Sequence, residues 1–536
     1  MKNRIVRNMI IILSITLLFG VISFSYAYFS LKIDGNSKDI VLSTGYLRLK
    51  YTDISVLNLE NAMPGDSVNK ILIVENIGTE DTSYNIVWKD LINQINYFDL
   101  HLDMKCKSYK NYGKSNQEEY GECKSFYKAV PYTETKIDKD IKRDIEIEVG
   151  VTQVYELTIT FLNRNYSQDD NLNRSFSGRI ELEEYVDEPI YCYSNDEKNY
   201  INGQYTYTSS GSNGWSVQLT DKMSTEPVNT VLCTYINNRP ITSFSNAFSD
   251  SEATSIDLGK INTKNVTSMY AMFMNSKATT IKGLELFDTS KVTEMQHMFR
   301  NTNFLSLDLS SFDTSNINSF LCYFFISKAT YIDVSSFDTS NVTNMGSFFN
   351  NTQAKHIDLS SFDTSNTTNF NSMFWGTNLE NVDLSSFDTR MVTNMGSMFQ
   401  SSNLKFLDLG NFNTRKVTNM GSMFQSSLIT EIKGLDSFDT SAVTDMSGMF
   451  YYSRLGNLDV SNFNTSNVTT MYRMFQGCKA KTLDLSSFNI DNVTDMTDMF
   501  RTAAATVGYA KNAEVASKFN DSSVTGIPNI LKFIVK

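Results

Sequence analysis

Aspartates recur in one column along the second half of the chain, and aligned carboxylates are groups that can hold cations. The column contains Asp257, Asp308, Asp333, Asp358, Asp383, Asp408, Asp459 and Asp484, with Lys282 and Lys433 filling the two gaps in its spacing of about 25 residues. On parallel strands about 4.8 Å apart, neighbouring carboxylates repel each other by about 1 kcal/mol in water. We therefore expect serine hydroxyls, solvent and salt, or a cation such as calcium, to offset the repulsion. Because no spaced loop of calcium ligands is present, a hydrogen-bonded ladder without metal remains the other interpretation.

A second group of residues departs from its surroundings and could contact a partner. Trp375 and Tyr451 stand where related segments carry a polar residue, Arg390 and Arg415 share one position in adjacent segments, and Lys416 follows Arg415. Aromatic and arginine side chains are typical anchors of protein interfaces. We expect the two arginines to form a small basic patch near Trp375. The alternative is that Trp375 fills a groove and that the arginines are only solvated.

Other chemistries find little support in the sequence. Three histidines, His101, His297 and His356, are too few and too scattered for a histidine metal site. Ser-His-Asp order, HExxH, P-loop and GxGxxG patterns are all missing, which predicts that the protein is not an enzyme. The net charge of −12 argues against nucleic acid as a partner.

These candidate residues lie in a repeated phrase, FDTSNVTxMxxMF, which sets their spacing. The phrase starts at Phe287, Phe312, Phe337, Phe362, Phe387, Phe412, Phe438, Phe463 and Phe488, with a weaker copy at Ile261. The step is 25 residues, except for two steps of 26 that carry the segments IKGLELF and IKGLDSF. A fixed period of this size indicates a solenoid, in which each coil is buried only by its neighbours.

Within one repeat, positions are counted from its first phenylalanine as position 0. Apolar residues at −5 and −3 alternate with polar ones, which predicts a strand. The following Asp-Thr-Ser-Asn predicts a corner, where the aspartate at +1 forms an Asx turn. Apolar residues at +5, +8, +11 and +12 predict one or two turns of helix, partly 3₁₀.

The phrases LDLSSFDTSNVTNMGSMF and MFQSSNLKFLDL resemble the BspA-type leucine-rich repeats of bacterial surface proteins. The resemblance covers about half of the chain, residues 241–505. It implies a right-handed solenoid with a parallel sheet on one face. It also implies attachment to host or neighbouring-cell surfaces.

Residues 1–27 have the pattern of an export signal. A basic start, an apolar run and Ser25-Tyr26-Ala27 predict cleavage after Ala27. The alternative is an uncleaved membrane anchor, for which the apolar run is short.

Residues 28–187 predict an antiparallel β-sandwich, because short strand-like runs alternate with turns. The segments AYFS, LSTGYLRLKYTD, AMPGDSV and VENIGTEDTSYNI resemble the TasA/camelysin group of secreted proteins. That group includes fibre subunits. The protease label of camelysin is not carried over, since no catalytic residues support it.

The cysteines predict two disulfides in an exported chain. Cys106 and Cys123 bracket a polar loop, and Cys192 and Cys233 lie in two strand-like runs. Cys322 and Cys478 differ in repeat position and are expected to stay unpaired. Residues 188–240 are expected to form a small β module that caps the solenoid, with Trp215 packed on it, and residues 506–536 are expected to form a C-terminal cap.

Together these observations predict a β-rich protein, a secreted or cell-surface bacterial adhesin. Its solenoid, of about ten coils, would bind a host extracellular-matrix or cell-surface protein or glycan. The alternative is a structural matrix or fibre component that self-associates through the β-sandwich and uses the repeats as a spacer.

Overall fold

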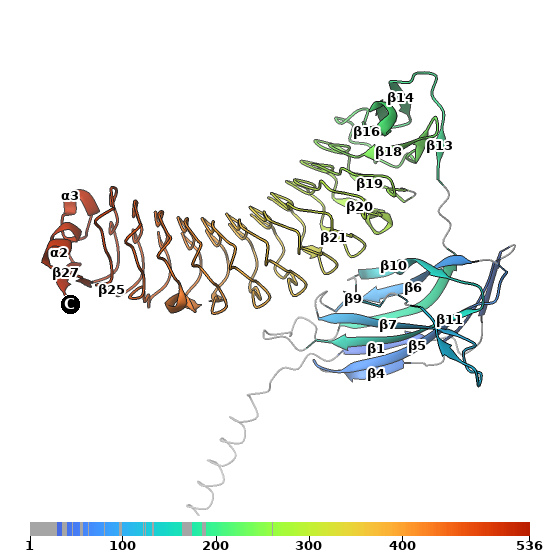
Figure 1. Cartoon of the computed structure of the whole chain (residues 1–536), viewed down its shortest axis with the longest axis horizontal. Coiled ribbons are helices and arrows are strands. Elements are labelled where there is room, and N and C mark those ends of the chain that lie inside the picture. The colour runs from blue at the N-terminus through green and yellow to red at the C-terminus, as the bar shows by residue number, and fades with distance from the viewer. Residues whose placement is uncertain are drawn as a thin grey trace, which may run out of the picture. The chain divides into compact units, whose positions relative to one another are not determined.

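The computed structural model describes residues 29–34, 40–44, 47–53, 57–62, 64–79, 81–95, 99–121, 123, 125–130, 133–162, 174–184, 189–259 and 261–536. The predicted signal segment and its cleavage site lie outside these residues. The chain forms two compact units, Met1–Val186 and Asp187–Lys536, and Figure 1 shows both.

The first unit contains two β-sheets. One has the strand order β10 (Thr133–Ile147), β6 (Thr82–Asn93), β12 (Ser175–Glu184), β1 (Phe29–Asp34) and β4 (Leu57–Ala62). The other has the order β2 (Ile40–Thr44), β3 (Leu47–Asp53), β5 (Ser67–Asn76), β11 (Val151–Phe161), β7 (Leu100–Lys110) and β8 (Glu118–Glu119), and β9 (Phe126–Ala129) also pairs with β7.

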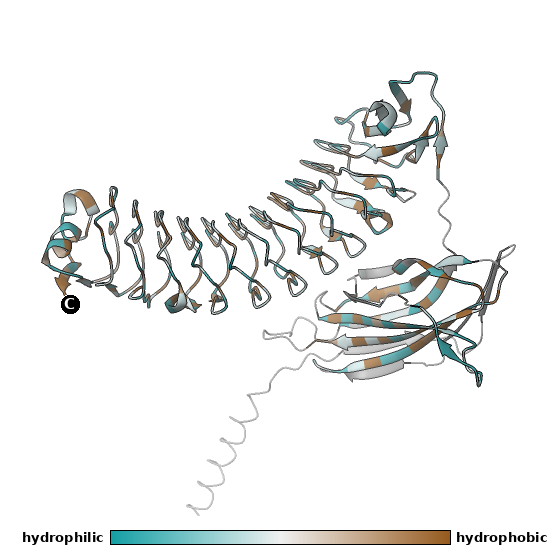
Figure 2. Ribbon diagram, in the orientation of Figure 1, coloured by the Kyte–Doolittle hydropathy of each residue, from teal (hydrophilic) through white to brown (hydrophobic). Residues whose placement is uncertain are grey.

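Side chains from both sheets share one apolar core, which includes Leu72 of β5, Trp88 of β6 and Leu157 of β11. Figure 2 shows the alternation of hydrophilic and hydrophobic residues along these strands. The prediction of a purely antiparallel arrangement is wrong at one place, because β1 and β12 pair in parallel. These two strands lie far apart in the sequence, so no tight hairpin fixes their relative direction.

The second unit begins with a small β module. Its sheet order is β13 (Tyr191–Cys192), β17 (Tyr235–Ile236), β18 (Arg239–Ser243), β16 (Trp215–Leu219), β15 (Tyr205–Ser209) and β14 (Asn199–Asn202), with a 3₁₀ turn η2 (Gly211–Asn213). Val228 of this module forms a parallel bridge with Ile256 of the first repeat strand, and the amide of Val228 donates to the carbonyl of Ser255 at 2.9 Å. The module therefore covers the open edge of the solenoid.

The repeats form coils that stack in parallel, as Figure 1 shows from β18 to β27. Their regular elements are β19 (Ser255–Asp257), β20 (Thr280–Lys282), η3 (Leu284–Leu286), β21 (Ser306–Asp308), β22 (Tyr331–Asp333), β23 (Phe406–Asp408), β24 (Glu431–Lys433), η4 (Leu435–Ser437), β25 (Thr482–Leu485) and β26 (Val507–Ala510). The parallel pairing joins residues one repeat apart, as in Leu307 with Ile332. This confirms the β-rich solenoid.

Each 26-residue repeat accommodates its extra residue in a 3₁₀ turn, η3 or η4. Gly283 and Gly434 precede these turns with φ of 91° and 87°. A Cβ on Gly283 would lie 2.5 Å from the carbonyl oxygen of Leu258. Glycine is therefore required where the lengthened coil passes its neighbour.

The prediction of a short helix after the corner is wrong. In the coil that starts at Phe337, every second amide bonds to the next coil at 2.7–3.0 Å, whereas the intervening amides of Phe348 and Asn350 bond three residues back. The first set comprises the amides of Met345, Ser347, Phe349 and Asn351. Ser347 and Asn351, at +10 and +14, have φ of 55° and 54°. The segment is a series of tight turns, because left-handed residues interrupt helical bonding.

A stack of phenylalanine rings at position +12 runs through the solenoid. It comprises Phe248, Phe273, Phe299, Phe324, Phe349, Phe374, Phe399, Phe424, Phe450, Phe475 and Phe500, all fully buried. Successive centroids are 5.3–6.0 Å apart with nearly parallel planes. This offset stacking is a favourable aromatic geometry.

The C-terminal segment closes the stack. It contains α2 (Ala513–Phe519), α3 (Ser522–Thr525) and β27 (Lys532–Val535), and β27 pairs with β26. Phe519 and Phe533 contact the last ring, Phe500, at 5.5 and 4.7 Å. The side-chain amide of Asn520 donates through Nδ2 to the backbone carbonyl of Phe533. Its Oδ1 accepts from the backbone amide of Phe533, and both bonds are 2.9 Å long. Asn520 thereby covers backbone groups of the last strand that could otherwise pair with another chain.

We expect Phe399→Ala to lower the free energy of unfolding of the second unit by about 3–5 kcal/mol, because it opens a cavity between Phe374 and Phe424. Urea titration followed by circular dichroism measures this loss. The control is Phe406→Ala, since Phe406 is 48% exposed and should lose about 1 kcal/mol or less. Equal losses in the two variants would contradict a stability that depends on the ring stack.

Candidate functional site

The aspartates of the column accept hydrogen bonds from nearby backbone amides of their own coils. The carboxylate oxygen Oδ1 of Asp308, Asp358 and Asp383 accepts the amide two residues on, at 3.1, 3.0 and 2.9 Å. Asp333 and Asp408 do the same at 3.0 Å. Asp333 is buried and also accepts from the hydroxyl of Tyr331 at 3.2 Å. Each of these aspartates therefore closes an Asx turn, which follows a strand at Asp308, Asp333 and Asp408.

The ammonium groups of three lysines from later coils form ion pairs with the other carboxylate oxygen, Oδ2. Lys282 is 3.7 Å from Asp257 and Lys433 is 2.6 Å from Asp408, and Lys536 pairs with Asp484. The contact with Lys433, assisted by the Gly410 amide, lowers the pKa of Asp408 below its ordinary value. The lengthened repeats thus provide an ammonium group where the column would otherwise add a carboxylate.

Within the part of the chain that the structure describes, no group of three or more histidine, cysteine, aspartate or glutamate residues is arranged to hold a metal ion. The calcium interpretation of the aspartate column stays a prediction.

The corners of successive coils are joined by a ladder of threonines at +2. The Thr389 hydroxyl donates to the carbonyl of Asn413 at 3.0 Å and accepts the amide of Asn413 at 2.7 Å. Other coils repeat the hydroxyl-to-carbonyl bond, through Thr263, Thr289, Thr314, Thr339, Thr364, Thr414, Thr440 and Thr465. The aspartates at +1 form Asx turns beside them, as Asp313 and Asp338 show.

A second ladder uses asparagine at +4. Lys291 replaces asparagine in one early coil, and three successive later coils also lack it. The ladder's side-chain amides donate to the carbonyl at +3 of the preceding coil at 2.7–2.8 Å, from Asn316, Asn341, Asn366, Asn467 and Asn492. Met391, Lys416 and Ala442 replace asparagine in three successive coils. None of these three side chains has an amide group, so the ladder's hydrogen bond is missing at these three positions.

Four exposed residues occupy the break, and we call Arg390, Met391, Arg415 and Lys416 the corner patch. Arg390 contacts the carboxylate of Asp388 at 2.5–3.0 Å and lowers the pKa of Asp388. The Lys416 ammonium lies 3.1 Å from the Met391 sulfur, which shows that adjacent corners are in contact.

Arg415 lies near the corner aspartate of the next coil. The hydroxyl and amide of Ser441 lower the pKa of Asp439, and Arg415 adds to that lowering. The structure therefore brings the predicted basic residues together on one side of the solenoid.

Trp375 and Tyr451 lie elsewhere on the coil, at +13 among the tight turns. Trp375 is 37% exposed, and Tyr451 meets the ring of Tyr452 edge-on at 4.7 Å. The predicted proximity of Trp375 to the arginines stays a prediction, since Trp375 is at +13 of its coil and the arginines are at +3 of theirs. The loss of asparagine at +4 is a sequence signal for the patch, and it adds Met391 to the predicted residues.

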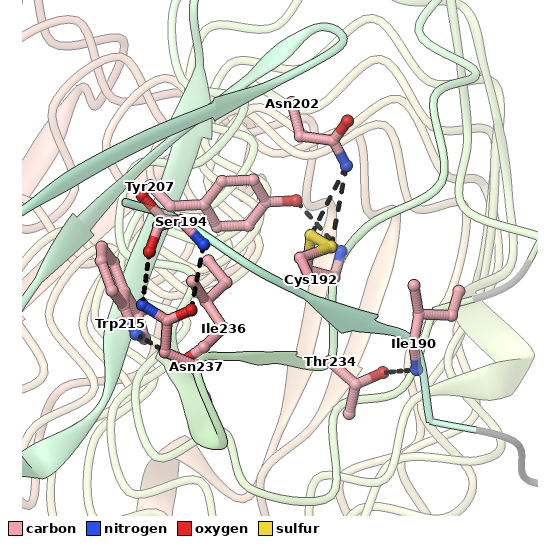
Figure 3. The surroundings of a disulfide bond; sticks show 10 residues. Ile190, Cys192, Ser194, Asn202, Tyr207, Trp215, Thr234, Ile236 and Asn237 are labelled. Atoms are coloured by element: carbon pink, nitrogen blue, oxygen red, sulfur yellow. Dashed lines mark hydrogen bonds between the residues drawn. A yellow bond between two sulfur atoms is a disulfide. The ribbon is translucent and has the colours of Figure 1, made fainter. Parts of the chain in front are cut away.

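Both predicted disulfides are present, Cys106–Cys123 and Cys192–Cys233, and Cys322 and Cys478 are free. Figure 3 shows the second disulfide, with Asn202 directed at its sulfurs, 3.8 and 3.5 Å away. The buried Trp215 indole donates to the Ile236 carbonyl at 3.1 Å. These contacts hold the capping module together.

Among the described residues, which exclude the predicted signal segment, no helix has the length and apolar character needed to cross a membrane.

Comparison with known proteins places the repeats in a family. The family described as "Mycoplasma protein of unknown function, DUF285" matches residues 242–355, 321–432 and 428–531, which together span more than half of the chain. No curated protein matches. The family match does not reach the first unit, whose resemblance to the TasA/camelysin group stays a prediction, as does the BspA-type assignment of the repeats.

One solved structure is similar, that of a leucine rich cell surface protein from Faecalibacterium prausnitzii A2-165. It has 11% sequence identity, covers 64% of this chain and 96% of its own, and has a TM-score of 0.25. A likeness of this size supports no conclusion about function.

We expect Lys433→Met to raise the pKa of Asp408 toward its ordinary value of about 4, which a carboxyl NMR titration measures. Because the folded pKa is lowered, the stabilisation is present above about pH 4 and is lost as pH falls through the folded pKa. Urea midpoints of variant and native chains should therefore differ slightly at pH 7 and converge in acid. Lys405→Met, which removes an exposed lysine without a carboxylate contact, is the control. An unchanged Asp408 titration in Lys433→Met would refute the pairing.

Proposed function

Because the chain belongs to the family described as "Mycoplasma protein of unknown function, DUF285", we propose its function from its own residues: it is an exported, surface-associated protein that binds a ligand through the solenoid. The corner patch is the observation that carries this proposal. At that site the chain gives up a repeated structural hydrogen bond in three successive coils and exposes two arginines, a lysine and a methionine.

The composition of the corner patch suits recognition. Arg390 and Arg415 lie one coil apart, and Asp388 already accepts from Nε and Nη2 of Arg390. Met391, which is 41% exposed, adds an adaptable apolar contact. On a chain of net charge −12, a local positive surface favours an acidic partner over contacts with the chain's own kind. A host or neighbouring-cell protein with an acidic surface has this chemistry.

Export is supported by the two disulfides. Such bonds form and persist in oxidising compartments outside the cytosol. The predicted signal segment 1–27 would bring the chain there.

The alternative role, a matrix or fibre component with the repeats as spacer, is favoured by the regularity of the ladders. Both solenoid ends are covered, by the β module and by the α2–β27 segment, so self-association would have to use the first unit. Sedimentation velocity measurements that show larger oligomers at higher protein concentration would support this role.

The proposal predicts that the triple variant Arg390→Ala, Arg415→Ala, Lys416→Ala loses binding to an array of extracellular-matrix proteins and mucins at least about tenfold. Removal of central interface anchors has effects of this size. The matched control, Lys264→Ala, Lys328→Ala, Lys405→Ala, changes the net charge equally at exposed positions elsewhere on the solenoid. Equal weakening of both triples would mean that only overall charge matters. No binding by the native chain would favour the spacer role.

A further inference from the structure

The coil that starts at Phe312 carries apolar residues on the outside of its tight-turn segment. Leu321, Phe325 and Ile326 stand at +9, +13 and +14, where later coils carry glycine, glutamine and serine. All three are half-buried, so each keeps part of its surface in solvent. The amide of Phe325 donates to the carbonyl of Cys322 at 3.3 Å, so one tight turn joins the group, which we call the outer cluster. Apolar groups gathered on one surface mark an interaction site.

Ile326 is a residue that the fold does not favour at its position. Its φ is 59°, and the left-handed conformation is costly for a β-branched side chain but accessible to asparagine. Asn301 and Asn351 occupy the same position in the coils on either side. Because Ile326 is not fully buried, the core does not require its apolar side chain. This residue therefore points to a role in recognition.

The outer cluster has a rigid support beneath it. The same coil has Phe320 at +8 and Tyr323 at +11, where most coils have methionine, and both are fully buried. Phe320 stacks on Phe337 at 5.2 Å, and Tyr323 meets Phe324 edge-on at 4.7 Å. Methionine has more rotatable bonds than these aromatic side chains. A rigid surface loses less conformational entropy when a partner docks on it.

The preceding coils extend this surface with aromatic and basic groups. The guanidinium of Arg300 lies over the ring of Phe325 at 5.0 Å, and the amide of Asn301 donates to the carbonyl of Phe325 at 2.6 Å. Burial and the nearby Arg300 lower the pKa of His297. The ring of Tyr270, which is 40% exposed, meets His297 edge-on at 5.5 Å. Printed side by side in this order, Tyr270, His297, Arg300 and Phe325 form one continuous row.

The tight-turn segments of these three coils contain basic residues and no aspartate or glutamate. They comprise residues 270–278, 296–304 and 321–329. Lys277 and Lys328 are exposed, and Arg300 is half-buried. Glu294, which precedes the second segment, accepts the hydroxyl of Ser268 at 2.8 Å. On a chain of net charge −12, this local positive charge favours an acidic partner.

We propose that the outer cluster, with Tyr270 and Arg300, is a docking surface for a segment of a partner protein that presents apolar and acidic side chains. The apolar side chains pack on Phe325 and Ile326, and the carboxylates pair with Arg300 and the exposed lysines. The surface is separate from the corner patch, which lies at +3 and +4 of later coils, and it gives the solenoid a second contact.

Apolar and basic residues together also suit an anionic lipid surface. Membrane insertion buries an apolar face among the lipid headgroups and acyl chains, which requires side chains that project beyond their polar neighbours. Leu321, Phe325 and Ile326 are half-buried instead, and Arg300 covers part of the Phe325 ring. A protein segment that packs against the surface fits this arrangement better.

The test selects short random peptides, displayed on phage, with the full chain as bait. We expect recovery of peptides that combine aspartate or glutamate with leucine, phenylalanine or tryptophan. Fluorescence titration then compares the native chain with the triple variant Leu321→Asn, Phe325→Gln, Ile326→Asn, which should bind these peptides at least about tenfold more weakly, since central anchors are removed. Each new residue occurs at the same position in another coil, so the triple variant should keep its Tm.

Two single variants serve as comparisons. Arg300→Gln removes the charge beside Phe325 and should weaken binding and reduce its salt dependence. Phe406→Asn removes an aromatic side chain that is 48% exposed on the strand side of the coil, where Asn381 holds the same position. Phe406→Asn should leave peptide binding unchanged.

Acidic, apolar peptides that bind the native chain and Phe406→Asn but not the triple variant support the surface. Recovery of no such peptide, or equal binding by the triple variant, overturns it. Binding to vesicles of phosphatidylglycerol and phosphatidylcholine without any recovered peptide also overturns it, in favour of a lipid. If every recovered peptide is lost by the corner-patch triple variant instead, the corner patch is supported and this surface is rejected.

Discussion

The ring stack at +12 is the constraint on which the solenoid depends. Each phenylalanine inside the stack packs against the rings of the coils before and after it, at 5.3–6.0 Å. The spacing of coils is therefore fixed by a contact that no coil can make alone. At both ends an aromatic ring turns edge-on and stops the stack: Tyr205 meets Phe248, and Phe519 meets Phe500. The extra residue of a lengthened repeat is absorbed in η3 or η4, outside the stack, so the rings stay in register.

Once the rings are in register, every other position of the repeat is also aligned from coil to coil. Threonine at +2 and asparagine at +4 become hydrogen-bonded ladders, and their polar groups are committed to neighbouring backbone. Recognition is therefore expected where a column changes its residue. Met391 and Lys416 interrupt the asparagine ladder, which resumes at Asn467, and the corner patch lies at this interruption.

The 25-residue period, the caps and the disulfides could be predicted because each depends on spacing or on residue type. The predicted strand forms in only some coils, at −6 to −4 as in Ser306–Asp308, and residues 356–358 and 381–383 form none. The helix after the corner was mispredicted because apolar residues at +5, +8, +11 and +12 fit a helical face. The residues that argue against a helix give a weaker signal. Positions +10 and +14 have positive φ and are serine, asparagine or glycine in many coils, as in Ser347, Asn351 and Gly376. The parallel pairing of β1 with β12 depends on packing between distant segments, which no local pattern encodes. The site residues can be predicted from their departure from the repeat, whereas the contact of Lys416 with Met391 depends on how adjacent coils stack.

The lengthened repeats also solve an electrostatic problem that alignment creates. In-register stacking places aspartates on neighbouring coils, where their repulsion adds up along the column. Each carboxylate accepts the hydrogen bond of its own Asx turn through Oδ1, and this bond does not neutralise the negative charge of the carboxylate. Lys282, Lys433 and Lys536 each place an ammonium on Oδ2 of the aspartate one or two coils before, and so divide the column into shorter acidic runs. Because Lys282 and Lys433 occur only in the repeats that carry the 3₁₀ insertion, one variation of the repeat changes both the backbone and the charge, and the ring stack is left undisturbed.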